Sequence, residues 1–559
     1  MIVMNDYRIA REELARLISV DLKEITYVLY KIRVENSYVS FKIPKKNGEH
    51  RVIDTPDDKL KWIQRKLSEK LHQVHSDYMT QNGIKTSVSH GFEKNKSIIT
   101  NAYRHKKKKY LLNIDISDFF SSFNFGRVQG YFYKSREFMF TKEVATIIAQ
   151  LVCYKGKLPQ GAPTSPIISN LIFNIVDLQI LALAKKYRLN YTRYADDMSF
   201  STNKKVFEKE HLNFIQELTD LLGKNGFEIN PNKTRLEYCS SKQEVTGLTV
   251  NNKINASQKF IKNTRAMANQ LYKTNSFQID GEDGTLNQLE GRFSFINQLD
   301  WLNNKLEYRT TKKKTNKKFI SGLNTREKQY QYFLFYKYFF RPSKPTIVTE
   351  GKTDILHIKS ALMKYCDKYP NLITKVADGK YDFKVYFLNK TKRLNYFFGI
   401  SSDGADTMKN IWNFYNGKNN CKNIYEHIKN KSQVESSNKV NPVILLFDNE
   451  QKSEKPLKKF LKYTDVNLEI DQISKQLKAN LFLQTIPLAN SLEECEIEDL
   501  YQKEVLNVTI NEKKFCRDAE DDFEKYFGKH IFSMYIMKHY NEVDFSNFLP
   551  ILDSINSLI

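Results

Sequence analysis

Two adjacent aspartates, Asp196 and Asp197, constrain the fold of this chain more than any other feature of its sequence. The segments on either side, Tyr191–Arg193 and Met198–Ser201, are short and rich in residue types that favour strands, so the pair is expected on a tight hairpin. An aspartate at a turn more often only bonds its own backbone. The pair therefore needs a partner elsewhere in the chain before it indicates a site.

That partner is Asp115, which ends the apolar, strand-like run Tyr110–Ile114. Phosphoryl transfer by two Mg²⁺ ions needs carboxylates that hold the metals roughly 4 Å apart. Asp115 and Asp196 are expected to bridge such a pair, with Asp197 nearby. The sequence therefore predicts a two-metal magnesium site in an α+β domain of short strands and longer helices.

Asp115 and the Tyr194–Asp197 hairpin resemble the palm of reverse transcriptases, whose hairpin carries an aromatic residue, any residue and two aspartates. The resemblance covers about Phe41–Val250. It implies an RNA-directed DNA polymerase with the right-hand architecture of fingers, palm and helical thumb.

The same resemblance assigns roles around the hairpin. The segment Pro159–Pro166 matches the family loop that supports the incoming nucleotide and the template, which involves Gln160 and Gly161. Phe120 falls where the family keeps the aromatic gate against the ribose 2′-hydroxyl, so deoxynucleoside triphosphates are the implied substrates. Four basic residues are expected at phosphates, namely Lys45, Lys46 and Arg51 in the fingers and Lys233 near the departing pyrophosphate.

Two shorter elements resemble signatures of the retron branch of this family. Asn101 and His105 fit its Asn-Ala-x-x-His element, and Val245, Thr246 and Gly247 fit its Val-Thr-Gly element. Alone, His105 could simply end a helix and Gly247 could form a simple turn. Placed together around the palm, they make the chain similar to retron reverse transcriptases.

The retron resemblance implies a specific RNA partner. Such an enzyme recognises its own structured non-coding RNA, primes from the 2′-hydroxyl of a guanosine and leaves a branched RNA–DNA product, msDNA. RNA-recognition residues are expected in the two signature elements and in the basic helices after Ala256, including Gly291 and Arg292. No segment resembles ribonuclease H, so a host ribonuclease H is expected to remove the template.

The net charge of +24 is confined to the first part of the chain. Residues 1–345 contain 58 Lys and Arg against 34 Asp and Glu, whereas residues 346–559 contain 30 of each. A field of this size favours a polyanionic partner, either nucleic acid or an anionic membrane. The neutral second part indicates a separate domain with a different role.

A joint is predicted at Arg341–Pro345, where two prolines disfavour helix. Before it we expect fingers and palm over residues 1–250 and a helical, RNA-binding thumb over 251–340. Residues 1 to about 80 are expected to be helical around a basic turn at Lys45–Gly48. The lysine run at 312–318 favours a solvated face and nucleic-acid contact about equally.

After the joint, residues 346–559 are predicted to form an α/β domain with a C-terminal helical extension. Strands are expected at Thr346–Thr349 and Val443–Phe447, each followed by carboxylates. Because the carboxyl ends of parallel strands meet at one edge, Glu350 and Asp448 are expected to share a site there.

These residues resemble a Toprim domain, the metal-binding fold of topoisomerases, primases and a class of nucleases. The resemblance implies Mg²⁺ and phosphodiester chemistry at Glu350 and Asp448. It departs at Glu450, where the family has aspartate, which leaves the role of this residue open. Asp403 and the cluster of Glu496, Glu498 and Asp499 are further candidates, although acids at a helix start are equally expected from the helix dipole.

The six cysteines lack the spacing of a metal site or a disulfide framework, so they are expected to be ordinary thiols in a cytoplasmic protein. The longest apolar stretch, Pro166–Ala184, is interrupted by four polar residues and is expected to be a core helix, with no membrane span.

The sequence thus favours an anti-phage retron protein in which a polymerase makes the RNA–DNA hybrid and a Toprim nuclease is the effector. Two alternatives stay open. The chain could be an intron-like or abortive-infection reverse transcriptase without a retron RNA, or a nucleic-acid-binding scaffold with an inactive Toprim domain. A homo-oligomer is also compatible with the sequence.

Overall fold

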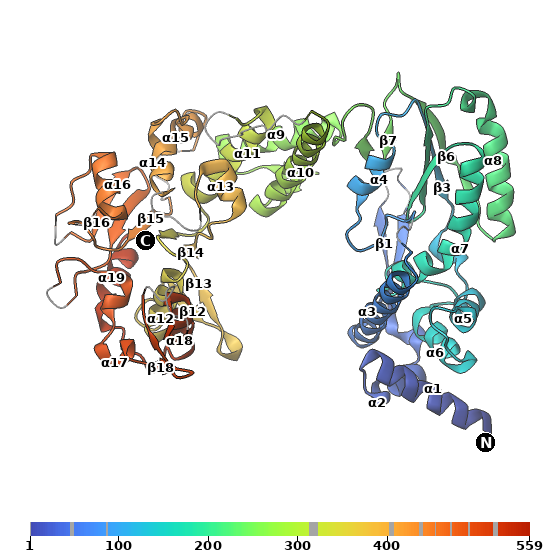
Figure 1. Cartoon of the computed structure of the whole chain (residues 1–559), viewed down its shortest axis with the longest axis horizontal. Coiled ribbons are helices and arrows are strands. Elements are labelled where there is room, and N and C mark those ends of the chain that lie inside the picture. Colours follow the sequence, from blue (N-terminus) through green and yellow to red (C-terminus); the bar gives the residue numbers. More distant parts are fainter. Residues whose placement is uncertain are drawn as a thin grey trace. The chain divides into compact units, whose positions relative to one another are not determined.

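The computed structural model describes residues 2–44, 48, 50–84, 88–311, 322–401, 407–434, 440–452, 454–469, 472–489, 492–517 and 524–559. The chain divides into two compact units, residues 1–257 and 258–559 (Figure 1). Each unit has its own hydrophobic core and is described separately.

Unit 1 contains a four-stranded antiparallel sheet, two strand hairpins and eight α-helices among its described residues. The helices are α1 Ile2–Ile18, α2 Leu22–Thr26, α3 Asp58–Gln81, α4 Ile98–Arg104, α5 Phe125–Lys134, α6 Lys142–Val152, α7 Ser165–Lys186 and α8 Phe207–Lys224. The strands are β1 Tyr38–Pro44, β2 His50–Pro56, β3 Tyr110–Ile116, β4 Asn190–Tyr194, β5 Asp197–Thr202, β6 Ile229–Tyr238, β7 Glu244–Val245 and β8 Leu248–Thr249.

The central sheet has the order β4-β5-β3-β6. Side chains alternate along β3, as they do in any strand. Leu112, Ile114 and Ile116 belong to the core formed with α7 and α8. Asn113 and Asp115 lie on the opposite face, where Figure 1 shows α4 and β7. The sheet therefore presents one apolar face to helices and one polar face to the predicted site.

The predicted helical character of residues 1 to about 80 is correct for α1 to α3 but wrong between Tyr38 and Pro56, where β1 and β2 form an antiparallel hairpin. Much of this hairpin is exposed, including Val39, Phe41 and Ile43. The apolar residues of the hairpin alternate with polar ones but do not form a buried face. Their spacing was therefore weak evidence for a strand.

Helix α7 is the predicted core helix. It is long and apolar enough to cross a membrane, but 61% of the apolar window is buried inside the protein. Length and composition alone are weak support for a span, because the core helix of a folded domain has the same properties.

Unit 2 begins with helices and continues as an α/β domain. Its helices include α9 Gln258–Thr274, α10 Leu286–Thr311, α11 Thr325–Phe335, α12 Asp354–Lys364, α13 Lys392–Phe398, α14 Lys409–Asn416, α15 Ile424–Lys429, α16 Pro456–Thr464, α17 Lys503–Leu506, α18 Lys529–Lys538 and α19 Leu549–Ser557. Its strands include β9 Gln278–Ile279, β10 Glu282–Asp283, β11 Thr346–Thr349, β12 Ile373–Lys375, β13 Tyr381–Phe383, β14 Tyr386–Phe387, β15 Val443–Phe447, β16 Ser474–Lys478, β17 Leu481–Thr485, β18 Thr509–Ile510, β19 Lys513–Phe515 and β20 Tyr526–Phe527.

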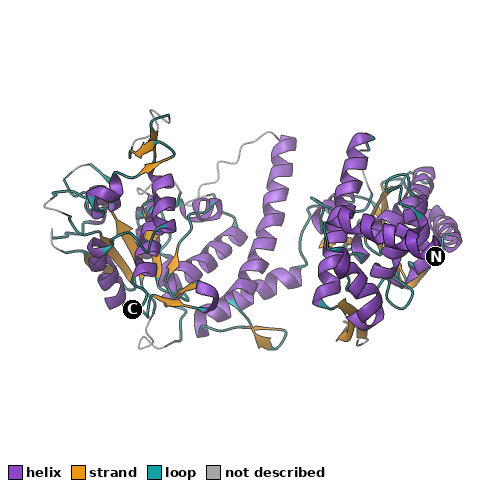
Figure 2. Ribbon diagram, turned by 90° about the horizontal axis from the view of Figure 1, so that it is seen from below, coloured by secondary structure: helices purple, strands orange, loops and turns teal. Residues whose placement is uncertain are grey.

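The main sheet of unit 2 has the order β14-β11-β15-β17-β16, and every pair except β16 with β17 is parallel. Figure 2 shows its strands lying among helices. Alternate residues of β15 face different cores: Val443 and Leu445 lie in one, Ile444 and Leu446 in the other. The predicted strands at β11 and β15 are confirmed.

The first helices of unit 2 share a core with its sheet. Phe335 and Phe339, at the end of α11 and in the following helical turn, pack against Phe398, and Phe335 also contacts Tyr415. The predicted joint at residues 341–345 therefore lies inside unit 2, with Pro342 and Pro345 buried. The functional boundaries at 250 and 341–345 remain predictions.

Candidate active sites

The polar face of the central sheet brings the three predicted aspartates of unit 1 together. Asp115 on β3 lies directly opposite Asp197, the first residue of β5. Asp196 occupies the two-residue turn between β4 and β5, and its carbonyl accepts a hydrogen bond from the Ile116 backbone at 3.0 Å. The register of one antiparallel pair thus sets the spacing of all three carboxylates.

The carboxylates oppose one another electrostatically. Loss of hydration, followed by the charges of Asp196 and Asp115, raises the pKa of Asp197 to about 6. Loss of hydration and Asp115 also raise the pKa of Asp196, against the smaller opposing effects of Lys233 and Arg51. Negative charge in this cluster is therefore incompletely neutralised by the protein.

Lys233 on β6 forms an ion pair with the cluster. Its Nζ donates hydrogen bonds to both carboxylate oxygens of Asp115, at 3.0 and 2.9 Å. Among the described residues no three His, Cys, Asp or Glu side chains are already arranged as metal ligands. The donor set nevertheless fits Mg²⁺, because hard carboxylate oxygens with unneutralised charge are the ligands this ion prefers.

A buried ion pair between Arg193 and Asp177 supports the β4–β5 turn. Arg193 is fully buried, and its guanidinium bonds both carboxylate oxygens of Asp177 on α7 and the carbonyl of Ala195. Ala195 has a positive φ of 56°, as the first central residue of such a turn requires. Removing either charge would leave the other buried without its partner.

Gly91 packs directly against the same turn. A Cβ atom at this position would lie 2.6 Å from the backbone nitrogen of Ala195. Sequence reasoning missed Gly91, Asp177 and Arg193, because these contacts join segments far apart in the chain.

The predicted nucleotide loop packs against the fingers hairpin. The Gln160 carbonyl accepts a hydrogen bond from the Asp54 backbone at 2.9 Å, and Gly161 has φ 134° with no room for a Cβ beside Asp54. Phe120 is half-buried, and the centre of its ring lies 6.3 Å from the ring centre of Phe92. Arg51 is exposed on β2, and its positive charge acts to lower the pKa of Asp196. Lys45 and Lys46 lie outside the described residues.

Asn101 and His105, predicted as RNA-recognition residues, do not present their side chains to solvent. Both side chains are fully buried. The two ring nitrogens of His105 lie 2.7 Å from the hydroxyls of Ser201 and Thr192, and Thr192 also donates to Asn101. These residues fasten α4 to the polar face of the sheet, so they support the surface that carries the aspartates.

The Val-Thr-Gly element forms the tight turn of the β7–β8 hairpin. Thr246 and Gly247 have φ values of 46° and 80°, which suit a two-residue hairpin turn. For a β-branched residue such as Thr246 this conformation is strained. Both line a small cavity of about 110 Å³ together with Asp115, Asp197 and Lys233. Val245 is buried, so the element meets the aspartates through its turn.

Gly291 and Arg292 lie on α10 in unit 2. Gly291 is exposed. Arg292 is half-buried, lies over the ring of Phe260 at 4.1 Å and donates to the Thr264 hydroxyl at 3.2 Å. Arg292 therefore also helps to hold α10 against α9.

A second carboxylate cluster lies at the carboxyl ends of β11 and β15. Glu350 accepts a hydrogen bond from the Asp448 backbone at 3.1 Å. Burial, with Asp354 and Glu450 nearby, raises the pKa of Glu350 to about 8. Burial and the charge of Glu350 raise the pKa of Asp448 well above its usual range. The predicted meeting of these two strands is confirmed.

Further acids surround this pair. Asp354, which sequence reasoning did not single out as a site residue, acts on both Glu350 and Asp448. Glu498 is fully buried and forms an ion pair with Lys529, whose ammonium lies 3.3 Å from one carboxylate oxygen. The other candidates are paired: Glu450 with Lys455, Glu496 with Arg517 and Lys529, and Asp499 with Arg517. Asp403 lies outside the described residues.

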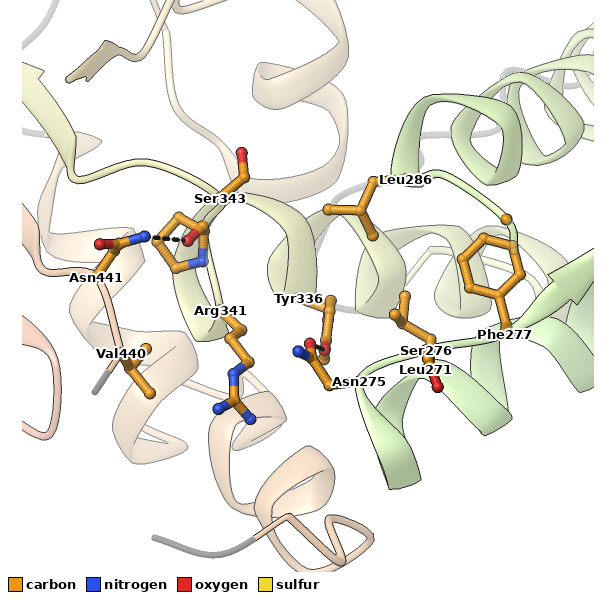
Figure 3. A pocket seen from close by; sticks show the side chains of 12 residues that line it. Leu271, Asn275, Ser276, Phe277, Leu286, Tyr336, Arg341, Ser343, Val440 and Asn441 are labelled. Carbon is orange, nitrogen blue, oxygen red and sulfur yellow. Dashed lines mark hydrogen bonds between the residues drawn. The ribbon is translucent and has the colours of Figure 1, made fainter. Parts of the chain in front are cut away.

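A separate cavity of about 570 Å³ lies near the predicted joint (Figure 3). Tyr336 donates a hydrogen bond to Asn275 at its wall, and Asn441 donates to the Pro342 carbonyl at 3.0 Å. None of the predicted catalytic carboxylates lines it. All six cysteines are free thiols.

Residues 43–252 match the family described as reverse transcriptase (RNA-dependent DNA polymerase). The retron Ec86 reverse transcriptase of Escherichia coli is 30% identical over 302 residues, which cover 52% of this chain and 82% of that protein. The retron Mx162 reverse transcriptase of Myxococcus xanthus is 30% identical over 324 residues, covering 52% of this chain and 64% of that protein. The match thus spans less than two thirds of the Mx162 protein.

Solved structures give weaker likeness. An apo telomerase from Candida tropicalis has 13% identity and a TM-score of 0.32, covering 53% of this chain and 60% of that one. A Candida albicans telomerase in complex with an RNA fragment has 11% identity and a TM-score of 0.31, covering 60% and 64%. Scores this low support no conclusion about this chain.

Proposed function

Because the chain belongs to the retron reverse transcriptases, we propose that it copies its own structured non-coding RNA into DNA, using deoxynucleoside triphosphates at the aspartates of unit 1. The observation that carries this proposal is the register that sets Asp115 opposite Asp197, with Asp196 in the adjoining turn. Two carboxylates on one sheet face and a third in the adjoining turn can hold the two metal ions that nucleotidyl transfer uses.

The aspartates act by holding charge at the reacting phosphate. Bound Mg²⁺ would activate the attacking 3′-hydroxyl and neutralise the leaving pyrophosphate. Asp115 and Asp196 are the expected ligands, with Asp197 beside them. Lys233, which bonds Asp115, would stabilise negative charge on the departing pyrophosphate.

The surrounding elements position the substrates. The Gln160–Gly161 loop, braced on β2, is suited to hold the incoming nucleotide against the template. Phe120 would exclude a ribose 2′-hydroxyl and Arg51 would meet triphosphate. The strained Thr246–Gly247 turn shares a cavity with Asp115 and Asp197 and would contact the primer end.

The RNA partner follows from the family. Priming from a 2′-hydroxyl of a guanosine would leave branched msDNA, with a host ribonuclease H removing the copied template in the cytoplasm. An intron-like or abortive-infection enzyme without such an RNA is the alternative. A structured inverted repeat beside the gene would favour the retron proposal.

For the α/β domain of unit 2 we propose a Toprim-type, Mg²⁺-dependent nuclease that acts as an anti-phage effector. Support comes from Glu350 and Asp448 meeting at the carboxyl edge of a parallel sheet, where ligands bind in such folds. The alternative is a scaffold without cleavage activity.

Two experiments test the halves of this proposal. The purified chain with its cognate RNA, Mg²⁺ and deoxynucleotides should yield DNA. Absence of any product would contradict the proposal that the chain copies its RNA into DNA. Glu350→Ala should abolish nucleic-acid cleavage or cellular toxicity while sparing DNA synthesis, and the exposed Glu504→Ala should change neither. Cleavage by Glu350→Ala at the wild-type rate would remove the nuclease proposal.

A further inference from the structure

A groove of about 600 Å³ runs between the first helices of unit 2 and α15, a helix of its α/β part. We call it the α9–α15 groove. It is lined by side chains from α9, α10, α11 and α15 and from the residues after α15. These are Lys262, Arg265, Ala266, Ala268, Asn269, Tyr272, Phe293, Thr325, Lys328, Gln329, Tyr332, His427 and Lys431.

The lining of the groove carries positive charge that no acidic residue offsets. Four of its side chains are Lys or Arg, and none is Asp or Glu. Lys262, Arg265 and Lys328 form no ion pair with a carboxylate anywhere in the described chain. Lys431 donates to the Asn269 side chain at 3.4 Å and lies 5.9 Å from the ring centre of Tyr272. Unpaired cations along a groove favour a chain of phosphates.

Aromatic rings lie beside these cations. The ring centres of Tyr332 on α11 and His427 on α15 are 4.9 Å apart, and both side chains are accessible to solvent. Burial, and then the charges of Lys431 and Lys422, lower the pKa of His427, which favours its neutral ring. A neutral ring next to a tyrosine can stack with an unpaired base.

The groove is held open by a continuous core. Ala268 and Tyr272 of α9, Phe333 of α11, and Ile424 and Ile428 of α15 all belong to one hydrophobic cluster. The backbone nitrogen of Gln433 also donates to the Lys273 carbonyl at 2.9 Å, which ties the segment after α15 to the end of α9. Its two walls are therefore preorganised and form without a ligand.

We propose that the α9–α15 groove binds a single strand of nucleic acid, with phosphates on Lys262, Arg265, Lys328 and Lys431 and a base on the Tyr332–His427 pair. This inference rests on the proposed function, which supplies both an RNA and its DNA copy as strands. Through α15 the effector part of the chain then contacts the polynucleotide directly. Binding of the strand can therefore change the activity of the effector part without any separate subunit.

The test uses the full chain and short single-stranded RNA or DNA oligonucleotides that carry a photoreactive thiobase. Lys431→Glu and Lys328→Glu alter opposite walls of the groove, and Lys429→Glu, at the exposed end of α15, is the charge-matched control. In wild type, crosslinks should map to the peptides containing Tyr332 and His427. Each wall variant should lose these crosslinks and reduce the salt dependence of binding by about one phosphate contact or more.

The outcomes separate this inference from the proposed function. Crosslinks with RNA alone, DNA alone or both would each support the groove and would identify the strand it holds. Unchanged crosslinks and salt dependence in both wall variants would overturn it. Extension of a preformed primer–template by the same variants is measured in parallel, because the aspartates of unit 1 remain intact. Persistent extension would show that the proposed function stands even if the groove does not.

Discussion

At the scale of single residues, the position of the aspartates depends on side chains that carry no catalytic chemistry. Gly91 leaves only enough space for the backbone of Ala195, and Arg193 with Asp177 fixes the strand beneath it. The turn therefore has no free space into which Asp196 and Asp197 could shift. A small displacement there moves the metal ligands themselves.

Gly91→Ala should therefore lower the rate of DNA synthesis by about 10- to 100-fold, since a displacement of about 1 Å in a catalytic group has an effect of this size. Gly130→Ala is the control, because a Cβ at Gly130 on α5 meets nothing within 4 Å. Primer extension under single-turnover conditions measures both. Equal rates for the two variants would show that the turn tolerates the displacement.

His105 makes a second prediction at this scale. Burial, with smaller effects of nearby positive charges, lowers the pKa of His105 to about 3. Below about pH 6.5, His105 is protonated in the unfolded chain but stays neutral in the folded protein. The free energy of unfolding should therefore fall as the pH drops from about 6.5 towards 3. His105→Gln cannot titrate and should show a shallower decline in urea unfolding at pH 7 and pH 5. Parallel declines in the two proteins would contradict this assignment.

Residue types and spacing were sufficient to predict that Asp115, Asp196, Asp197, Glu350 and Asp448 lie at strand ends or in a turn, because strand ends could be located from the apolar runs before them. They did not reveal that Asn101 and His105 are buried. A short polar motif specifies residue types, but only the fold decides whether their polar atoms meet solvent or a neighbouring strand.

At the scale of elements, strand edges determine where charge collects. The parallel strands β11 and β15 carry Glu350 and Asp448 to one edge because both strands run in the same direction. The β1–β2 hairpin was not predicted, since its apolar residues are exposed. Apolar periodicity predicts only elements that bury a face.

The acids at the β11–β15 edge should destabilise the metal-free protein. Asp448→Asn keeps an oxygen for the Ile497 backbone bond but removes a carboxyl group whose ionised form is opposed by burial and by Glu350 and Asp354. In the presence of a chelator it should raise the free energy of unfolding by about 0.5–2 kcal/mol, as relief of strain at functional sites commonly does. It should also abolish cleavage.

The matched control is Asp367→Asn, at an exposed position outside the cluster. Thermal unfolding with and without Mg²⁺ gives the comparison. If Asp448→Asn is no more stable than Asp367→Asn under chelation, the cluster carries no unfavourable charge.

At the scale of the whole molecule, positive charge and hydrophobic core divide the chain at different places. The excess of Lys and Arg ends near residue 345, whereas the compact units divide at 257. Residues 258–340 therefore combine the charge of the first part with the core of the second. Composition alone could not show this, because aromatic residues of α11 do not indicate which domain they pack against.

This shared core predicts how fragments behave. A fragment of residues 258–559 should unfold in a single calorimetric transition, because α9 and α11 are packed into the core of the sheet. A fragment of residues 346–559 exposes the apolar side chains that α11 covers, so it should bind a hydrophobic dye and aggregate. A soluble, cooperatively folding 346–559 fragment would show instead that the joint separates independent domains.

The three aspartates of unit 1 are the proposed centre of RNA-templated DNA synthesis. The decisive measurement is extension of a DNA primer on an RNA template, with Mg²⁺ and deoxynucleotides, by wild type, Asp197→Asn and the control Asp220→Asn on the outer helix α8. Wild type and Asp220→Asn should extend the primer at equal rates, and Asp197→Asn should lose at least about 100-fold. Extension by Asp197→Asn at the wild-type rate would contradict the account.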